Sequence, residues 1–153
     1  MIENTVQHDY PIAPVAFNKI KLTDQFWLPR LTVQKNETIP FALKKTEQAV
    51  DNLRLAGAFL RGEDAPKPFP HRFVSSDLYK VLEGAAYSLT LDRKPQLEAE
   101  MDQLIRIIRQ AQQDDGYLYV AHTCGIANPS EMGEKPYSWV VHSHELYNMG
   151  HMY

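Results

Sequence analysis

The chain has 153 residues, of which 44% are hydrophobic and 23% are charged. This composition is typical of a globular protein, and the length suits one domain. The net charge is −3 without a Lys/Arg cluster, and no apolar run approaches the ~18 residues of a membrane span, so we expect no nucleic-acid partner and no membrane partner. No signal-peptide pattern opens the sequence, and the compartment, cytoplasmic or periplasmic, is left open.

Cys124 is the single cysteine, which excludes an internal disulfide and a multi-cysteine zinc site within the chain. We expect it to be a free thiol, at the surface or half-buried. The sequence stops on MGHMY inside a helical pattern, with no Gly, Asn or Pro to end the helix. We therefore expect the sequence to be truncated.

Residues 1–22 predict an extended N-terminal arm with at most one or two edge strands, because Pro11 and Pro14 break the alternating apolar positions. We expect the domain proper to occupy residues 23–153. Thr23 or Asp24 can cap its first helix.

Pro40 suits the first position of a second helix, over residues 40–60, which Gly57 could interrupt. A loop with three prolines is predicted for residues 61–74. Two further helices follow, over residues 76–89 and 95–113. Their expected buried faces are Leu78, Val81, Leu82, Ala85, Ala86 and Leu89 in the first, and Leu97, Met101, Leu104, Ile105, Ile108 and Ala111 in the second.

After Gly116, the sequence DDGYLYV could add a short strand, and a loop is expected over residues 121–136. Within the last stretch, PYSWVVHSHELYNMGHMY, a helix is predicted to begin with Ser143 as its N-cap. On that helix His144, Asn148 and His151 lie on one face, while the neighbouring Glu145 points elsewhere. A polar stripe needs a wet cavity or polar partners, so this face is a candidate ligand site.

A structural interpretation of the same helix has to be weighed. A histidine on a helix is more often solvated or satisfied than functional, and Leu146, Met149 and Tyr153 look like ordinary core. A metal site is not expected, because HELYNMGH lacks the HExxH spacing and helix geometry separates His144 from His151 by about 10 Å.

The predicted elements make an all-α array of helical hairpins. Four blocks of sequence, in this order and spacing, resemble the N-terminal part of glycoside hydrolase family 127, the β-L-arabinofuranosidase family: FWLPRL, VSSDLYKVLEGAAYSL, AQQDDGYLY and SEMGEKPYSWVVHSHELYNMGHMY. The resemblance implies a catalytic (α/α)6 barrel, of which this chain would supply roughly half. It also implies a retaining hydrolase acting on β-L-arabinofuranosides or related plant glycans.

The resemblance further implies that a cysteine thiolate is the nucleophile, held in a zinc site of cysteines and a glutamate, with another glutamate as acid/base. These residues are expected beyond residue 153, so the chain itself is expected to have no catalytic residue, to bind no zinc and to be inactive alone. Cys124 stands outside any matching motif.

In such a barrel, the helices starting near Ser76 and Ser143 would be inner ones. We therefore expect Asp77, Tyr117, Tyr119, His142 and His144 near one cavity, with His151 on the same helix face. Polar groups beside aromatic rings suit a sugar, and His144 matches a sugar-binding position of the family. The alternative is an all-α binding or scaffold module without chemistry. Half a barrel would expose apolar faces, so self-association is expected.

Overall fold

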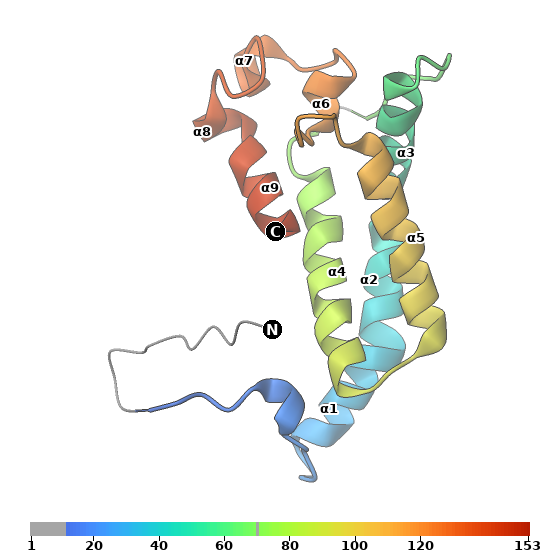
Figure 1. The fold of residues 1–153 in the computed structure, drawn as a ribbon, viewed down its shortest axis with the longest axis vertical. Helices are drawn as coiled ribbons and strands as arrows, with labels where there is room; N and C mark the ends of the chain where they lie inside the picture. The colour runs from blue at the N-terminus through green and yellow to red at the C-terminus, as the bar shows by residue number, and fades with distance from the viewer. Residues whose placement is uncertain (1–11, 70) are drawn as a thin grey trace.

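The computed structural model describes residues 12–69 and 71–153. Every regular element in these ranges is a helix, and they contain no strand. Figure 1 shows the long helices lying side by side, with the last helix beside one edge of this layer and the short helices that precede it toward one end. The predicted all-α class is confirmed. None of the described helices is both long enough and apolar enough to cross a membrane.

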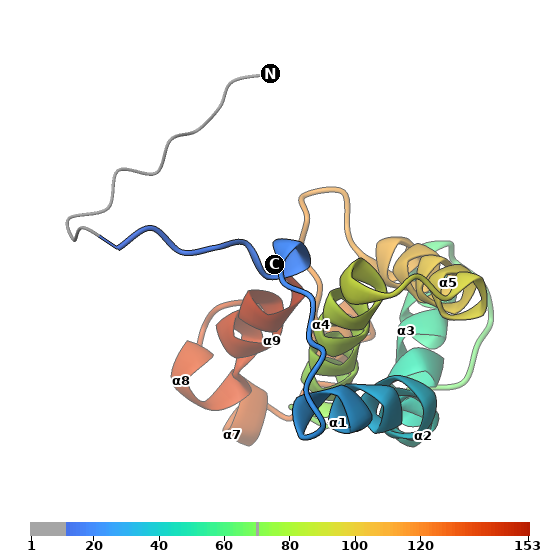
Figure 2. The same cartoon turned by 90° about the horizontal axis from the view of Figure 1, so that it is seen from below.

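The N-terminal segment is irregular apart from a 3-10 turn, η1 (Phe17–Lys19), so the described part of the arm has no edge strand. A strand expected within residues 1–11 lies outside the described residues. The Phe17 ring meets Tyr87 edge-on, with the ring centroids 5.2 Å apart, and Figure 2 shows this segment running past α4. Asp24 acts as predicted at the start of the next helix, because its Oδ1 accepts hydrogen bonds from the backbone N–H groups of Phe26 and Trp27.

The first long element is an almost continuous helical rod. It comprises α1 (Trp27–Val33), a π-helical turn η2 (Gln34–Thr38), α2 (Ile39–Lys45) and α3 (Glu47–Leu60). The chain is already helical in the π turn before Pro40, and α2 begins at Ile39, one residue before the predicted helix start. Gly57 does not interrupt α3. A Cβ on Gly57 would lie 3.1 Å from the Gln110 carbonyl oxygen, so the glycine allows α3 and α5 to approach closely.

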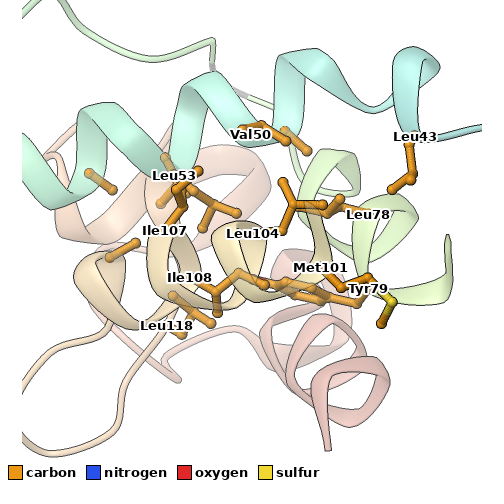
Figure 3. Packing of buried hydrophobic residues seen from close by; sticks show 14 of the residues in the cluster. Leu43, Val50, Leu53, Leu78, Tyr79, Met101, Leu104, Ile107, Ile108 and Leu118 are labelled. Atoms are coloured by element: carbon orange, nitrogen blue, oxygen red, sulfur yellow. The ribbon is translucent and has the colours of Figure 1, made fainter. Parts of the chain in front are cut away.

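Helices α4 (Val74–Leu91) and α5 (Pro95–Ala111) pack against α3, and α4 also contacts α2 and α9. Leucines 53 and 78 are at most 1% exposed at the centre of this core, shown in Figure 3, and burying such a side chain stabilises the fold by about 1.5–3 kcal/mol. One position of the predicted stripe of α5 is wrong: Ile105 is 53% exposed, and Ile107 is buried instead. Ile107 follows Leu104 by three residues and so shares its face. Similarly, Ala86 of α4 is exposed.

Four short helices complete the chain: α6 (Val120–Thr123), α7 (Pro129–Met132), α8 (Val140–Ser143) and α9 (Glu145–Met152). The segment 117–119, where a strand was possible, is buried without forming one. The predicted N-cap is also wrong, because Ser143 ends α8 and the residue before α9 is His144. Of the three residues expected as core on α9, Met149 is buried, whereas Leu146 is 58% and Tyr153 is 87% exposed.

Candidate functional site

The junction between α8 and α9 has an unusual backbone. His144 has φ 57° and ψ 27°, which is the left-handed conformation that non-glycine residues rarely adopt. This conformation costs roughly 1–2 kcal/mol for an L-residue. It separates α8 from α9, so the two helices form a corner instead of one longer helix.

Four rings gather beside this corner, and we call them the aromatic face: Phe73, His144, Tyr147 and His151. The ring centroids of His144 and Phe73 are 4.7 Å apart, and those of Tyr147 and His151 are also 4.7 Å apart. Tyr147 lies between the two histidines, with 6.1 Å to the His144 ring. The face is accessible, since Tyr147 is 44% exposed. Rings with polar edges can stack on a ligand and hydrogen-bond to it.

Two charged residues of α4 border the aromatic face. The Lys80 Nζ lies 5.2 Å from the centroid of the Tyr147 ring, which is cation–π distance. Asp77 accepts a hydrogen bond from Lys80 through its Oδ1, over 3.2 Å. Tyr147, with a smaller contribution from Asp77, raises the pKa of the Lys80 ammonium, so the lysine stays charged. The border therefore offers both a cation and a carboxylate.

Asn148 is a buried residue that connects the backbone segments carrying the aromatic face. It is 1% exposed, its Nδ2 donates to the carbonyl oxygens of Arg72 and His144 over 2.8 Å each, and its Oδ1 accepts from the Ser76 N–H over 3.0 Å. The Ser76 N–H is one of the donors that a helix start leaves unpaired. Asn148 is thus a cross-link between the starts of α4 and α9, and all its bonds are made within the protein.

Tyr117 and Tyr119 lie in the interior, away from the aromatic face. They are 4% and 6% exposed, and their hydroxyls donate to the Glu145 carboxylate and to the Ser143 carbonyl oxygen respectively. Burial, helped by the negative charge of Glu145, raises the pKa of Tyr119 to about 12 and raises the pKa of Tyr117 as well. Both phenols are therefore neutral donors that support the α8–α9 corner.

His142 is exposed and packs on Trp139, with 4.2 Å between the ring centroids. Of the six residues that sequence reasoning named, the structure therefore brings together Asp77, His144 and His151. Sequence reasoning missed Tyr147 and Phe73. Tyr147 could have been found, because it lies three residues after His144 and four before His151 on the same helix face. Phe73 comes from a distant loop and carried no such signal.

Glu145 is the most buried charge of this region, with no exposed surface. Its carboxylate accepts hydrogen bonds from the Ser143 hydroxyl over 2.6 Å, from the Tyr137 N–H over 3.0 Å and from the Tyr117 hydroxyl. A buried charge is tolerated only when it is hydrogen-bonded in this way. As expected from its place in the sequence, Glu145 points away from the aromatic face.

The residues present do not fit a zinc–thiolate site. Within the described ranges, no three His, Cys, Asp or Glu side chains gather closely enough to hold a metal ion. Cys124 is 6% exposed in the hydrophobic core, and burial raises the pKa of its thiol, which favours the neutral form over the thiolate.

A cavity of about 470 Å³ opens elsewhere, between α2, α3 and α5, where its lining includes Glu47, Asp51, Arg54 and Glu100. None of the six predicted residues lines it. The aromatic face is the stronger candidate, because it combines rings, a cation and a carboxylate at a strained corner of the backbone.

The fold and this face define a segment built of helical hairpins, with a ring-lined surface at one end, of the kind that (α/α)-barrel enzymes contain. Comparison with known proteins makes the class specific. The family model of the β-L-arabinofuranosidase GH127 catalytic domain matches residues 19–153. The chain belongs to this family.

Individual relatives agree. The non-reducing end β-L-arabinofuranosidase of Bifidobacterium longum subsp. longum is 38% identical over 104 residues, which are 67% of this chain and 15% of the relative. A GH127 β-arabinofuranosidase of known structure superposes with a TM-score of 0.81 at 34% identity, covering 96% of this chain and 23% of that one. A GH127 β-L-arabinofuranosidase from Geobacillus stearothermophilus gives a TM-score of 0.73 at 31% identity, covering 86% and 20%. The chain thus spans less than a quarter of each relative, as part of a catalytic domain.

Proposed function

We propose that this chain forms part of the sugar-binding wall of a retaining glycoside hydrolase that acts on β-L-arabinofuranosides or related plant glycans. The observation that carries the proposal is the aromatic face, in which His144, Tyr147 and His151 present rings and ring nitrogens next to Asp77 and Lys80. A furanose offers apolar C–H faces and several hydroxyls, which match rings and polar edges respectively.

Within this proposal, each residue has a distinct task. Tyr147 supplies a flat surface for the C–H face of the sugar. His144 and His151 supply ring nitrogens for its hydroxyls, and the Asp77 carboxylate accepts a hydrogen bond from a hydroxyl at the border. Tyr117 and Tyr119 act from the interior by supporting the corner at which His144 lies. His142 stays a predicted sugar contact. It lies apart from the aromatic face, where it packs on Trp139.

We also propose that the chemistry belongs to the parent enzyme as a whole. There the family resemblance implies a zinc-held cysteine thiolate and a glutamate, supplied by residues other than those of this chain. Two observations support assigning the chemistry to other residues. The Cys124 thiol is buried and neutral, and the described residues contain no cluster of His, Cys, Asp or Glu that could hold a metal ion. The segment alone is accordingly proposed to bind a sugar without cleaving it.

The test is an NMR titration of the 153-residue chain with methyl β-L-arabinofuranoside, following the ring signals of the histidines and tyrosines. We expect shifts at His144, Tyr147 and His151, and their loss in Tyr147→Ala. Tyr87→Ala is the matched control, because Tyr87 is similarly exposed, at 52%, and packs on Phe17, about two helical turns along α4 from Lys80. Uniform shifts, or shifts that Tyr87→Ala abolishes equally, would refute the assignment.

A further inference from the structure

The segment 137–144, called the loop below, contains the single-turn helix α8, and it begins and ends in a strained conformation. Tyr137 has φ 61° and His144 has φ 57°, and within the described residues these are the only two non-glycine positions with positive φ. Each costs roughly 1–2 kcal/mol. Such conformations persist only where the surroundings over-determine them.

One side chain touches both ends of this loop. The Glu145 carboxylate accepts the Tyr137 N–H over 3.0 Å, which fixes the first strained residue. Glu145 directly follows His144, the second strained residue, and accepts the Ser143 hydroxyl over 2.6 Å, just before it. The Tyr117 hydroxyl anchors the same carboxylate to the buried segment 117–119. The buried carboxylate therefore links the two ends of the loop by hydrogen bonds.

The orientation of His144 follows from this closure. Because Glu145 is drawn fully into the interior, and the left-handed turn at His144 separates α8 from α9, the imidazole is directed outward to the Phe73 ring. A right-handed conformation at His144 would continue α8 into α9 and give the ring another direction. Asn148 donates a hydrogen bond to the His144 carbonyl oxygen but makes none with Tyr137, so its hydrogen bonds do not hold the other end of the loop.

We propose that Glu145 is a positioning residue, whose buried carboxylate clamps both ends of the loop 137–144 and so holds His144 in the conformation that presents its imidazole at the aromatic face. The sugar-affinity part of this inference rests on the proposed function. Glu145 has no exposed surface, so it acts through His144 and does not touch the ligand.

The decisive comparison is between substitutions that keep and break the clamp. In Glu145→Gln the amide oxygen can still accept from Tyr137 and Tyr117, while the amide N–H donates to the Ser143 hydroxyl. Glu145→Ala leaves these donors unpaired. Glu145→Asp keeps the charge but withdraws the carboxylate by one methylene. Ile107→Ala is the control, because it removes buried volume from α5 without touching the loop.

The measurement is NMR on the 153-residue chain below its melting temperature. The one-bond Cα–Hα coupling of His144 and its intraresidue amide–Hα NOE report positive φ, and titration with methyl β-L-arabinofuranoside gives the affinity. We expect Glu145→Ala and Glu145→Asp to lose the positive-φ signature and to weaken binding roughly tenfold, as for one lost hydrogen bond. Glu145→Gln should keep the signature, with affinity within about threefold of the unsubstituted chain. Ile107→Ala should melt earlier and change neither readout.

Positive φ at His144 with undiminished affinity in Glu145→Ala would overturn the inference and leave Glu145 with a role in stability alone. Should Glu145→Ala fail to fold, Glu145→Asp decides by the same two readouts. If the unsubstituted chain does not bind the arabinoside, the proposed function fails. The conformation of His144 in the variants still decides whether Glu145 positions it.

Discussion

Replacing His144 by glycine and by alanine should separate its two contributions, because the left-handed conformation opposes stability while the ring serves binding. Glycine adopts φ 57° without the penalty of roughly 1–2 kcal/mol that alanine retains. Both substitutions remove the ring contacts with Phe73 and Tyr147, a loss of about 0.5–1.5 kcal/mol for each contact. His144→Gly should therefore be more stable than His144→Ala by about 1–2 kcal/mol.

For a chain of this size, that difference corresponds to roughly 2–8 °C in melting temperature. Affinity should behave differently. Both variants lose the same imidazole, so both should bind methyl β-L-arabinofuranoside more weakly by the same factor, about tenfold for one hydrogen bond. In the parent enzyme proposed above, the same loss should appear in kcat/KM. Thermal melts followed by circular dichroism, together with the NMR titration, measure the two quantities on the same samples.

Two results would contradict this reasoning. A glycine variant less stable than the alanine variant would mean that His144 does not adopt a left-handed conformation in solution. Unchanged affinity in both variants would mean that the ring serves packing alone. Glu131→Ala is a suitable control for the effect of substitution itself. Replacing this exposed residue of α7 should change neither stability nor affinity.

Other consequences can be measured on the same chain. Met149→Ala should destabilise it by about 2 kcal/mol or more, whereas Leu146→Ala, at 58% exposure, should change stability by less than about 0.5 kcal/mol in urea unfolding. Because the pKa of Tyr119 rises from 10.0 to about 12 on folding, its stabilising effect is complete below pH 10 and lost as the pH rises to 12, and Tyr119→Phe should flatten this part of the pH–stability curve. The exposed apolar side chains of α8 and α9 should drive concentration-dependent association in sedimentation experiments, weakened by Val141→Asp, which replaces a side chain 73% exposed. Purified with added zinc, the chain should release no arabinose from methyl β-L-arabinofuranoside. Release that Cys124→Ser abolished would contradict the proposal that the catalytic residues lie outside this chain.

The elements that the sequence predicted best are those with strong local signals. Asp24 caps a helix as expected, and the apolar period of residues 95–113 identifies α5 with one displaced position. The predicted start at Pro40 is one residue late, because proline is equally compatible with the first and the second position of a helix. Residues 121–136, where a loop was expected, contain most of α6 and all of α7, since four-residue helices have no periodicity from which to predict them.

The candidate site was harder to predict, because its geometry depends on partners distant in sequence. Asn148 completes the start of α4 from 72 residues away, so no local pattern could assign its hydrogen bonds. Likewise, the aromatic character of Tyr117 suggested a sugar contact, but only the packing shows its hydroxyl turned toward Glu145. The boundary between the arm and the domain, at residues 22 and 23, stays a prediction.

The error at Ser143 is informative, because it identifies the point where local preference was overridden. Serine before an acidic residue is a favourable helix start, and a helix capped there would need no residue in a left-handed conformation. Instead the chain accepts strain at His144 and buries the charge of Glu145, two costs that a stable scaffold would avoid. Sequences deviate from locally consistent choices mainly where function requires it. The strain falls at His144, whose ring contacts Phe73 and Tyr147, and the buried charge falls at the next residue, which supports placing the proposed sugar-binding role at the corner between α8 and α9.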